Sequence, residues 1–87
     1  MSPRYRVQIE RRAQKALNAL PRDLRRRVAA KVDALAENPR PLGVRNLEGE
    51  EDLYRLRVGD HRVLYAIRDA VLLVLVVRIA DRREVYR

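Results

Sequence analysis

The residues from Asp52 to Ile67 constrain the fold most, because two alternating runs flank the turn dipeptide Gly59-Asp60. This pattern predicts a β-hairpin with a two-residue loop. Such a loop fixes the register of the two strands, so Arg57 should pair with Arg62. Period-two alternation then gives the hairpin an apolar face that packs against a core, formed by Tyr54, Leu56, Val58, Val63, Tyr65 and Ile67.

The opposite face of the predicted hairpin carries Arg55, Arg57 and Arg62. Like charges directly opposite one another on a sheet are destabilising unless something compensates them. The arginine pair therefore predicts an anion-binding site on this face. The alternative is that these arginines are ordinary solvent-facing residues of a half-buried sheet.

The length and the charge of the chain limit its number of domains and the kind of partner it can bind. The 87 residues are expected to form a single domain, residues 1–87, because a chain this short has no room for a second core. Lys and Arg number 20 against 12 Asp and Glu, which gives a net charge of +8. A polyanionic partner follows, with nucleic acid the first candidate. The alternative is a solvated, arginine-rich surface that reflects a GC-rich coding background.

The N-terminal half predicts one strand and two helices. Residues Tyr5–Ile9 alternate as a strand does, and apolar residues from Glu10 to Leu20 fall on one helical face. Pro21 ends this helix and suits the first turn of the next, which extends to about Glu37. Two amphipathic helices joined at a proline form an αα-hairpin that would cover one face of a sheet.

The C-terminal half adds three strands, of which the hairpin supplies two. Pro39–Asp52 is an extended connector, and Val71–Ile79 is apolar on both faces, which predicts a central strand. The expected fold is α+β in the order β-α-α-β-β-β. Its sheet is small and mostly antiparallel, and the αα-hairpin packs on one face. The basic face should stay open.

Several kinds of site are excluded by the motifs that are missing. The chain has no P-loop, no dinucleotide-binding fingerprint, no His-Glu-x-x-His and no cysteine, and its only serine is Ser2. Neither a cofactor nor a metal is therefore expected. Arginine forks suit phosphate oxygens, and tyrosines stack on unpaired bases. The first residues carry no signal peptide and the longest apolar run, Ala70–Val77, is too short to span a bilayer, so we expect a cytoplasmic protein.

Four segments, in order, resemble the RelE/ParE superfamily of toxins from toxin–antitoxin systems. The hairpin Tyr54–Tyr65 resembles the signature hairpin of these toxins. Asn38–Pro41 and Leu47–Gly49 resemble the segment before it, and Arg82–Arg87 resembles the C-terminal motif. The resemblance covers nearly the whole chain and implies the same fold.

RelE-type members are ribosome-dependent endoribonucleases that cleave mRNA by attack of a ribose 2′-hydroxyl on the adjacent phosphodiester. By this resemblance, Arg55 and Arg57 occupy the two basic hairpin positions. Arg62 would stabilise the pentavalent phosphorane, Arg82 would stabilise charge on the leaving 5′-oxygen, and Tyr86 would pack on a substrate base. The tail that carries Arg82 and Tyr86 has an alternative role as a packing strand or an antitoxin contact.

The general base of such a reaction is the part that this sequence lacks. RelE has lysines at the positions of Arg55 and Arg57, and an arginine does not give up its proton near neutral pH. His61 is the obvious substitute as an acid or base, but the predicted register turns it toward the core face, where a structural role is the alternative. Ala80-Asp81 stands where relatives often have Gly-His.

The resemblance also implies partners: a cognate antitoxin, the ribosome with its mRNA, and operator DNA only through the antitoxin. No membrane partner is expected. Three basic residues on the second helix, Arg25, Arg26 and Lys31, are candidates for RNA contact or for simple solvation. Two other functions stay open: a ParE-like inhibitor of DNA gyrase without ribonuclease activity, or a weakly active toxin that works mainly in a repressor complex.

Overall fold

The computed structural model describes residues 4–50 and 52–81. Strands and helices follow one another along the chain in the predicted order, with one short strand added between the helices and the hairpin. The elements are β1 (Arg6–Ile9), α1 (Arg11–Asn18), α2 (Arg22–Ala34), β2 (Arg45–Asn46), β3 (Leu53–Val58), β4 (His61–Arg68), the 3₁₀ helix η1 (Asp69–Val71) and β5 (Leu73–Asp81).

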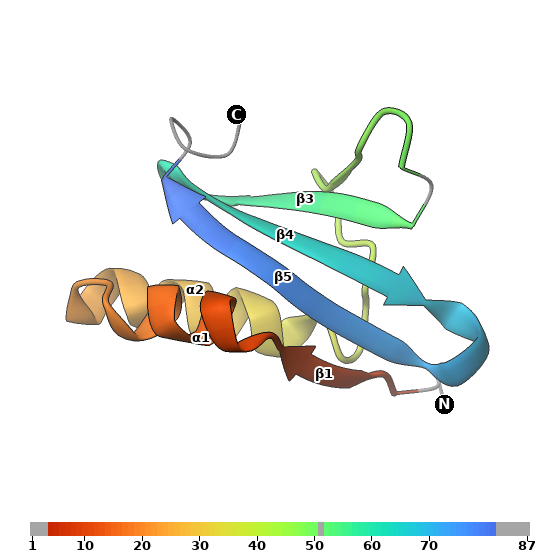
Figure 1. Ribbon diagram of the computed structural model, residues 1–87, viewed down its shortest axis with the longest axis horizontal. Helices are drawn as coiled ribbons and strands as arrows, with labels where there is room; N and C mark the ends of the chain where they lie inside the picture. The colour runs from red at the N-terminus through yellow and green to blue at the C-terminus, as the bar shows by residue number, and fades with distance from the viewer. Residues whose placement is uncertain (1–3, 51, 82–87) are drawn as a thin grey trace.

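The strands form one sheet in the order β1-β5-β4-β3-β2. β1 runs parallel to β5, and every other neighbouring pair is antiparallel. Both helices lie on one side of the sheet (Figure 1), which confirms the α+β class and the αα-hairpin packed on one face. In the described part of the chain, neither helix has the length and apolar character that a membrane crossing requires.

The hairpin has the predicted register. Arg57 pairs with Arg62, and Val58 pairs with His61 on either side of the two-residue turn. Gly59 has φ +60°, whereas Asp60 is not among the residues with positive φ. A glycine with positive φ at the first central position is the requirement of a type II′ turn, whose twist suits a hairpin.

The core lies between the helices and the hairpin's apolar face. Val28 and Val32 stand one helical turn apart on α2 and are fully buried, so they present one stripe to the sheet. The buried Tyr65 hydroxyl donates a hydrogen bond of 2.7 Å to the carbonyl oxygen of Pro39, which satisfies a polar group that would otherwise be costly in a core. The sheet's contribution comes from Leu56, Val58, Val63, Tyr65, Ile67, Val74, Val76 and Ile79.

Three expectations about the strands were wrong in detail. β5 lies inside the sheet, between β1 and β4, as predicted, but the middle strand of the five is β4. β1 pairs with β5 only from Leu73 to Val76. The predicted start at Val71 falls in η1, because a 3₁₀ turn and the left-handed Leu72 come first. The connector contains β2, which the sequence reading missed. The C-terminal tail, for which a role as a packing strand was an alternative, lies outside the described residues.

Candidate anion-binding site

A pocket rich in arginine lies on the sheet face opposite the helices. Its cavity of about 190 Å³ is lined by Gly43, Arg45, Arg55, Arg57 and Arg62. Among residues 4–50 and 52–81, the side chains that line it carry four guanidinium groups and no carboxylate. We refer to it below as the arginine pocket.

Strand pairing brings these arginines together from three strands. Arg57 of β3 pairs with Arg62 of β4, and Arg45 of β2 pairs with Arg55 of β3. Partners that stand directly opposite each other in a sheet point to the same face, and residues two apart on a strand share that face. The sheet therefore aligns two arginine pairs side by side, which confirms the predicted arginine face and adds Arg45 to it.

Arg62 is not as open as expected. Its side chain is only 9% exposed, whereas Arg57 and Arg45 are exposed and Arg55 is partly so. The prediction of a wholly open basic face is wrong here, because Arg62 lies on the central strand and has neighbouring strands on both sides. A guanidinium stays protonated even when buried, and its attraction to an anion is stronger where water is scarce. Arg62 is thus the strongest anchor that the pocket offers.

Gly43 and Arg45 are the lining residues that sequence reasoning missed. They belong to the connector, which carries no alternation long enough to predict a strand. β2 is only two residues long, and it is held by pairing with β3 and by the Asn46 side chain, whose Nδ2 donates to the Leu53 carbonyl oxygen at 2.9 Å. The one signal in the sequence is that the loop between Asn46 and Leu53 is short, so that the residues around Val44 can fold back beside β3.

A family model described as the ParE toxin of the type II toxin–antitoxin system parDE matches residues 7–86 of this chain. The chain belongs to the RelE/ParE family of toxins. Among curated relatives, the putative toxin RelE1 of Methanocaldococcus jannaschii is 26% identical over 87 residues, with 97% of each chain covered.

Solved structures of RelE toxins have the same fold. A chain of the RelE–RelB complex from Pyrococcus horikoshii OT3 is 35% identical with a TM-score of 0.82, and the match covers 92% of this chain and 97% of that chain. The isolated RelE toxin of E. coli is 27% identical with a TM-score of 0.79, and the match covers 94% of this chain and 90% of that chain.

Of the other predicted site residues, those that the structure describes do not line the arginine pocket. His61 pairs with the buried Val58, so it lies on the helix side of the sheet, as its register predicted. The basic residues of α2, which are Arg25, Arg26 and Lys31, also lie on that side and are exposed. Lys31 lines a separate cavity with Pro41 and Leu42. The tail residues Arg82 and Tyr86 lie outside the described residues.

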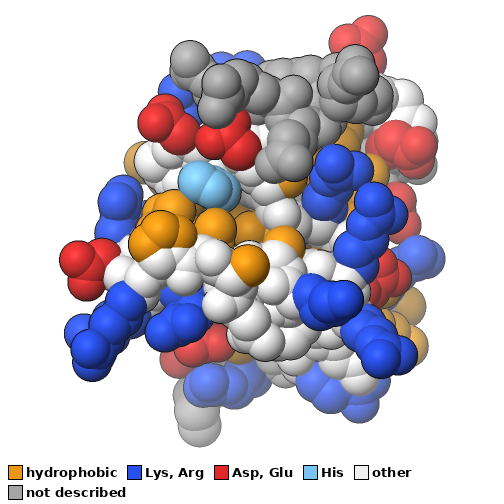
Figure 2. Space-filling model, turned by 60° about the vertical axis from the view of Figure 1, so that its left-hand side comes forward, with side chains coloured by type: hydrophobic (Ala, Val, Ile, Leu, Met, Phe, Trp, Pro, Cys, Tyr) orange, Lys and Arg blue, Asp and Glu red, His pale blue; other side chains and the backbone are white. Residues whose placement is uncertain are grey.

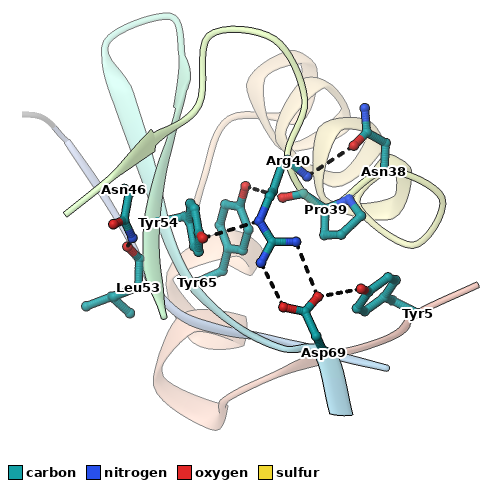
Figure 3. Close-up of polar contacts among 9 residues, drawn as sticks. All are labelled: Tyr5, Asn38, Pro39, Arg40, Asn46, Leu53, Tyr54, Tyr65 and Asp69. Carbon is teal, nitrogen blue, oxygen red and sulfur yellow. Dashed lines mark hydrogen bonds and ion pairs between the residues drawn. The ribbon is translucent and has the colours of Figure 1, made fainter. Parts of the chain in front are cut away.

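A polar network centred on Arg40 holds the start of the connector. Its guanidinium donates to both carboxylate oxygens of Asp69, at 3.2 and 2.8 Å, and its Nε donates to the Tyr54 hydroxyl at 3.2 Å (Figure 3). The Tyr5 hydroxyl donates to the same carboxylate at 2.5 Å. Arg40 and Tyr5 together lower the pKa of Asp69 to about 2, while the hydrogen bond to Asp69 raises the pKa of Tyr5.

On the face that Figure 2 shows, basic side chains are spread widely rather than gathered in one patch. In Figure 2 they lie on both sides of the view, interspersed with acidic side chains and separated by a group of apolar ones. Net charge therefore does not mark the site by itself. What distinguishes the arginine pocket is that strand pairing lines one cavity with four guanidinium groups.

Proposed function

We propose that this toxin is an endoribonuclease that cleaves mRNA on the ribosome and thereby inhibits translation. The observation that carries the proposal is the arginine pocket, with the nearly buried Arg62 beside the exposed Arg57. In the proposed reaction a ribose 2′-oxygen attacks the adjacent phosphorus while the bond to the 5′-oxygen breaks. The products are a 2′,3′-cyclic phosphate and a free 5′-hydroxyl.

The pocket suits the charge that develops in this reaction. Two negative charges accumulate on the phosphorane oxygens, and preorganised guanidinium donors stabilise such charge more in the transition state than in the substrate. We assign this role to Arg62, with Arg57 opposite it on β3. Arg82 and Tyr86 keep the roles that the resemblance implies, at the leaving oxygen and at a substrate base.

The proposed chemistry relies on positioning and charge rather than on a conventional base. Arginine is a poor general base, and His61 lies across the sheet from the pocket. The 2′-hydroxyl proton would then leave to water while Arg57 and Arg62 stabilise the oxyanion, and water would return a proton to the departing 5′-oxygen to give the 5′-hydroxyl. Orientation contributes because the 2′-oxygen must stand in line with the departing 5′-oxygen before it attacks the phosphorus.

We also propose a cognate antitoxin as the partner of this toxin. RelE toxins of this fold have been solved as RelE–RelB complexes from Pyrococcus horikoshii and E. coli. An antitoxin that covers the arginine pocket with acidic side chains would block its anion site directly. Contact with operator DNA would then come only through the antitoxin.

A second candidate function is inhibition of DNA gyrase without RNA cleavage. It is favoured by the family model, which describes a ParE toxin, and by the lack of a carboxylate or histidine among the described residues that line the pocket. One experiment separates the two functions: the toxin is induced in cells, and RNA 5′ ends and DNA breaks are mapped together. The nuclease predicts mRNA ends within translated codons, whereas gyrase-linked DNA breaks with intact mRNA would reject it.

A further inference from the structure

The arginine pocket contains two arginine pairs rather than one. Arg57 and Arg62 form the first pair, and Arg45 and Arg55 form the second. Arg55 and Arg57 are about 6.6 Å apart along β3, twice the strand rise of about 3.3 Å. The two pairs extend to opposite neighbours of β3, about 4.8 Å away on each side, so the centres of the pairs are about 8 Å apart at the backbone. Successive phosphates of an extended nucleic-acid strand are separated by a comparable distance.

One phosphodiester does not occupy both pairs. It carries a single negative charge and two non-bridging oxygens, which one arginine pair can satisfy with bidentate hydrogen bonds. The cavity of about 190 Å³ extends from Arg62 past β3 to Arg45 and Gly43, so the second pair has room for its own ligand. Gly43 has no side chain to fill that end of the cavity.

We propose that Arg45 and Arg55 bind the phosphodiester next to the one held by Arg57 and Arg62, so that the pocket takes two consecutive phosphates of single-stranded RNA. This inference rests on the proposed ribonuclease function, because it takes RNA as the ligand. Arg45 is its distinguishing residue. The side chain is exposed on the edge strand β2, and it forms no ion pair with a carboxylate in residues 4–50 and 52–81.

Arg45 would act on binding more than on chemistry. A contact to a phosphate that does not react is made equally in the substrate and in the transition state, so its loss raises KM more than it lowers kcat. Arg62 should show the opposite balance, because it contacts the reacting phosphate. This contrast separates a binding role for Arg45 from damage to the fold, which would affect both parameters in every variant.

The test measures binding of the purified toxin to a short single-stranded RNA whose 2′-hydroxyls are methylated, so that it is not cleaved. Arg45→Ala should weaken binding about tenfold and should reduce the slope of log K against log salt by about 0.7, the value for one phosphate contact with a single strand. Arg45→Lys should restore most of the slope. The matched control is Arg22→Ala, an exposed arginine at the start of α2, which should change neither quantity.

A second arm replaces single phosphates of the same RNA with neutral methylphosphonates, one linkage at a time. In the wild type, neutralising one linkage next to the best-bound phosphate should weaken RNA binding as much as Arg45→Ala does. In the Arg45→Ala variant, the same neutral linkage should not weaken RNA binding further. The inference is overturned if the two losses add, if Arg45→Ala behaves like Arg22→Ala, or if the wild type does not bind the RNA in 50 mM salt.

Failure of the proposed function would look different. A wild type that shows this two-phosphate pattern but leaves ribosome-bound mRNA intact contradicts the nuclease and supports the two-phosphate site. A wild type that cleaves ribosome-bound mRNA, together with an Arg45→Ala variant of unchanged KM and unchanged salt slope, supports the nuclease and overturns the two-phosphate site.

Discussion

Arg40 and Asp69 form a bidentate ion pair across 29 residues of sequence, with nitrogen–oxygen distances of 3.2 and 2.8 Å. The pair joins the start of the connector to η1, at the end of β4 (Figure 3). Further along, the connector is fixed again where β2 pairs with β3. Of the two connector residues that line the arginine pocket, Gly43 lies between these attachment points and Arg45 lies at the second one.

The pH dependence of stability should reveal this pair. The pKa of Asp69 is lowered from 3.8 to about 2 by its hydrogen bonds from Arg40 and Tyr5. A carboxyl group with a lowered pKa in the folded state adds stability above its unfolded pKa and loses it as the pH falls through the folded one. The contribution should therefore be constant at neutral pH and should disappear between about pH 4 and pH 2.

The measurement is Tm against pH for the wild type and for Asp69→Asn. At pH 7 the variant should melt below the wild type, and the two curves should converge toward pH 2. The difference should also shrink at high salt, because the Arg40 and Asp69 side chains are 44% and 55% exposed. A gap between the curves that is the same at pH 2 and pH 7 would show that the ion pair adds nothing.

The Tyr65 hydroxyl should contribute measurably to stability. It lies in the core and donates to the Pro39 carbonyl oxygen at 2.7 Å, which ties the connector to β4. Tyr65→Phe keeps the ring and its stacking on Tyr54 but leaves that carbonyl without its donor. We expect the free energy of unfolding to fall by about 1 kcal/mol, measured by urea denaturation. Tyr5→Phe, at an exposed hydroxyl, is the comparison and should cost less.

The hairpin could be predicted from the sequence because its determinants are local. Gly59-Asp60 sets the turn, and strict alternation sets the faces, so the pairing of Arg57 with Arg62 and the inward position of His61 both followed. The apolar stripe of α2 followed from helical periodicity for the same reason, although the helix ends at Ala34 rather than at Glu37.

The rest of the site could not be predicted because it depends on long-range pairing. β2 has only two residues, and its place beside β3 is decided by contacts rather than by pattern, so Arg45 had no recognisable role. The order of strands also decides burial. An apolar run predicts an enclosed strand at 71–79, but nothing in it shows that β4 lies in the middle of the sheet, where its Arg62 is nearly buried.

Leu72 is a position where a smaller residue should stabilise the protein. Its backbone has φ 51° and ψ 53°, a left-handed conformation that raises the free energy of any residue with a Cβ atom. Leu72→Gly should raise the free energy of unfolding by about 0.5–1 kcal/mol, after the extra flexibility of an unfolded glycine is subtracted. The neighbouring Val71 has no positive φ, so Val71→Gly is the control and should destabilise instead. Equal losses in both variants would show that Leu72 is not strained.

Cleavage on purified ribosomes tests the central claim most directly. Ribosomes programmed with a defined mRNA are mixed with toxin, and new RNA 5′ ends are mapped by primer extension. The account predicts cuts within the codon held in the ribosome for the wild type, and a rate about 100-fold lower for Arg62→Ala with a native circular dichroism spectrum. Intact mRNA with the wild type, or undiminished cutting by a folded Arg62→Ala, would contradict the assignment of the arginine pocket as the site of RNA cleavage.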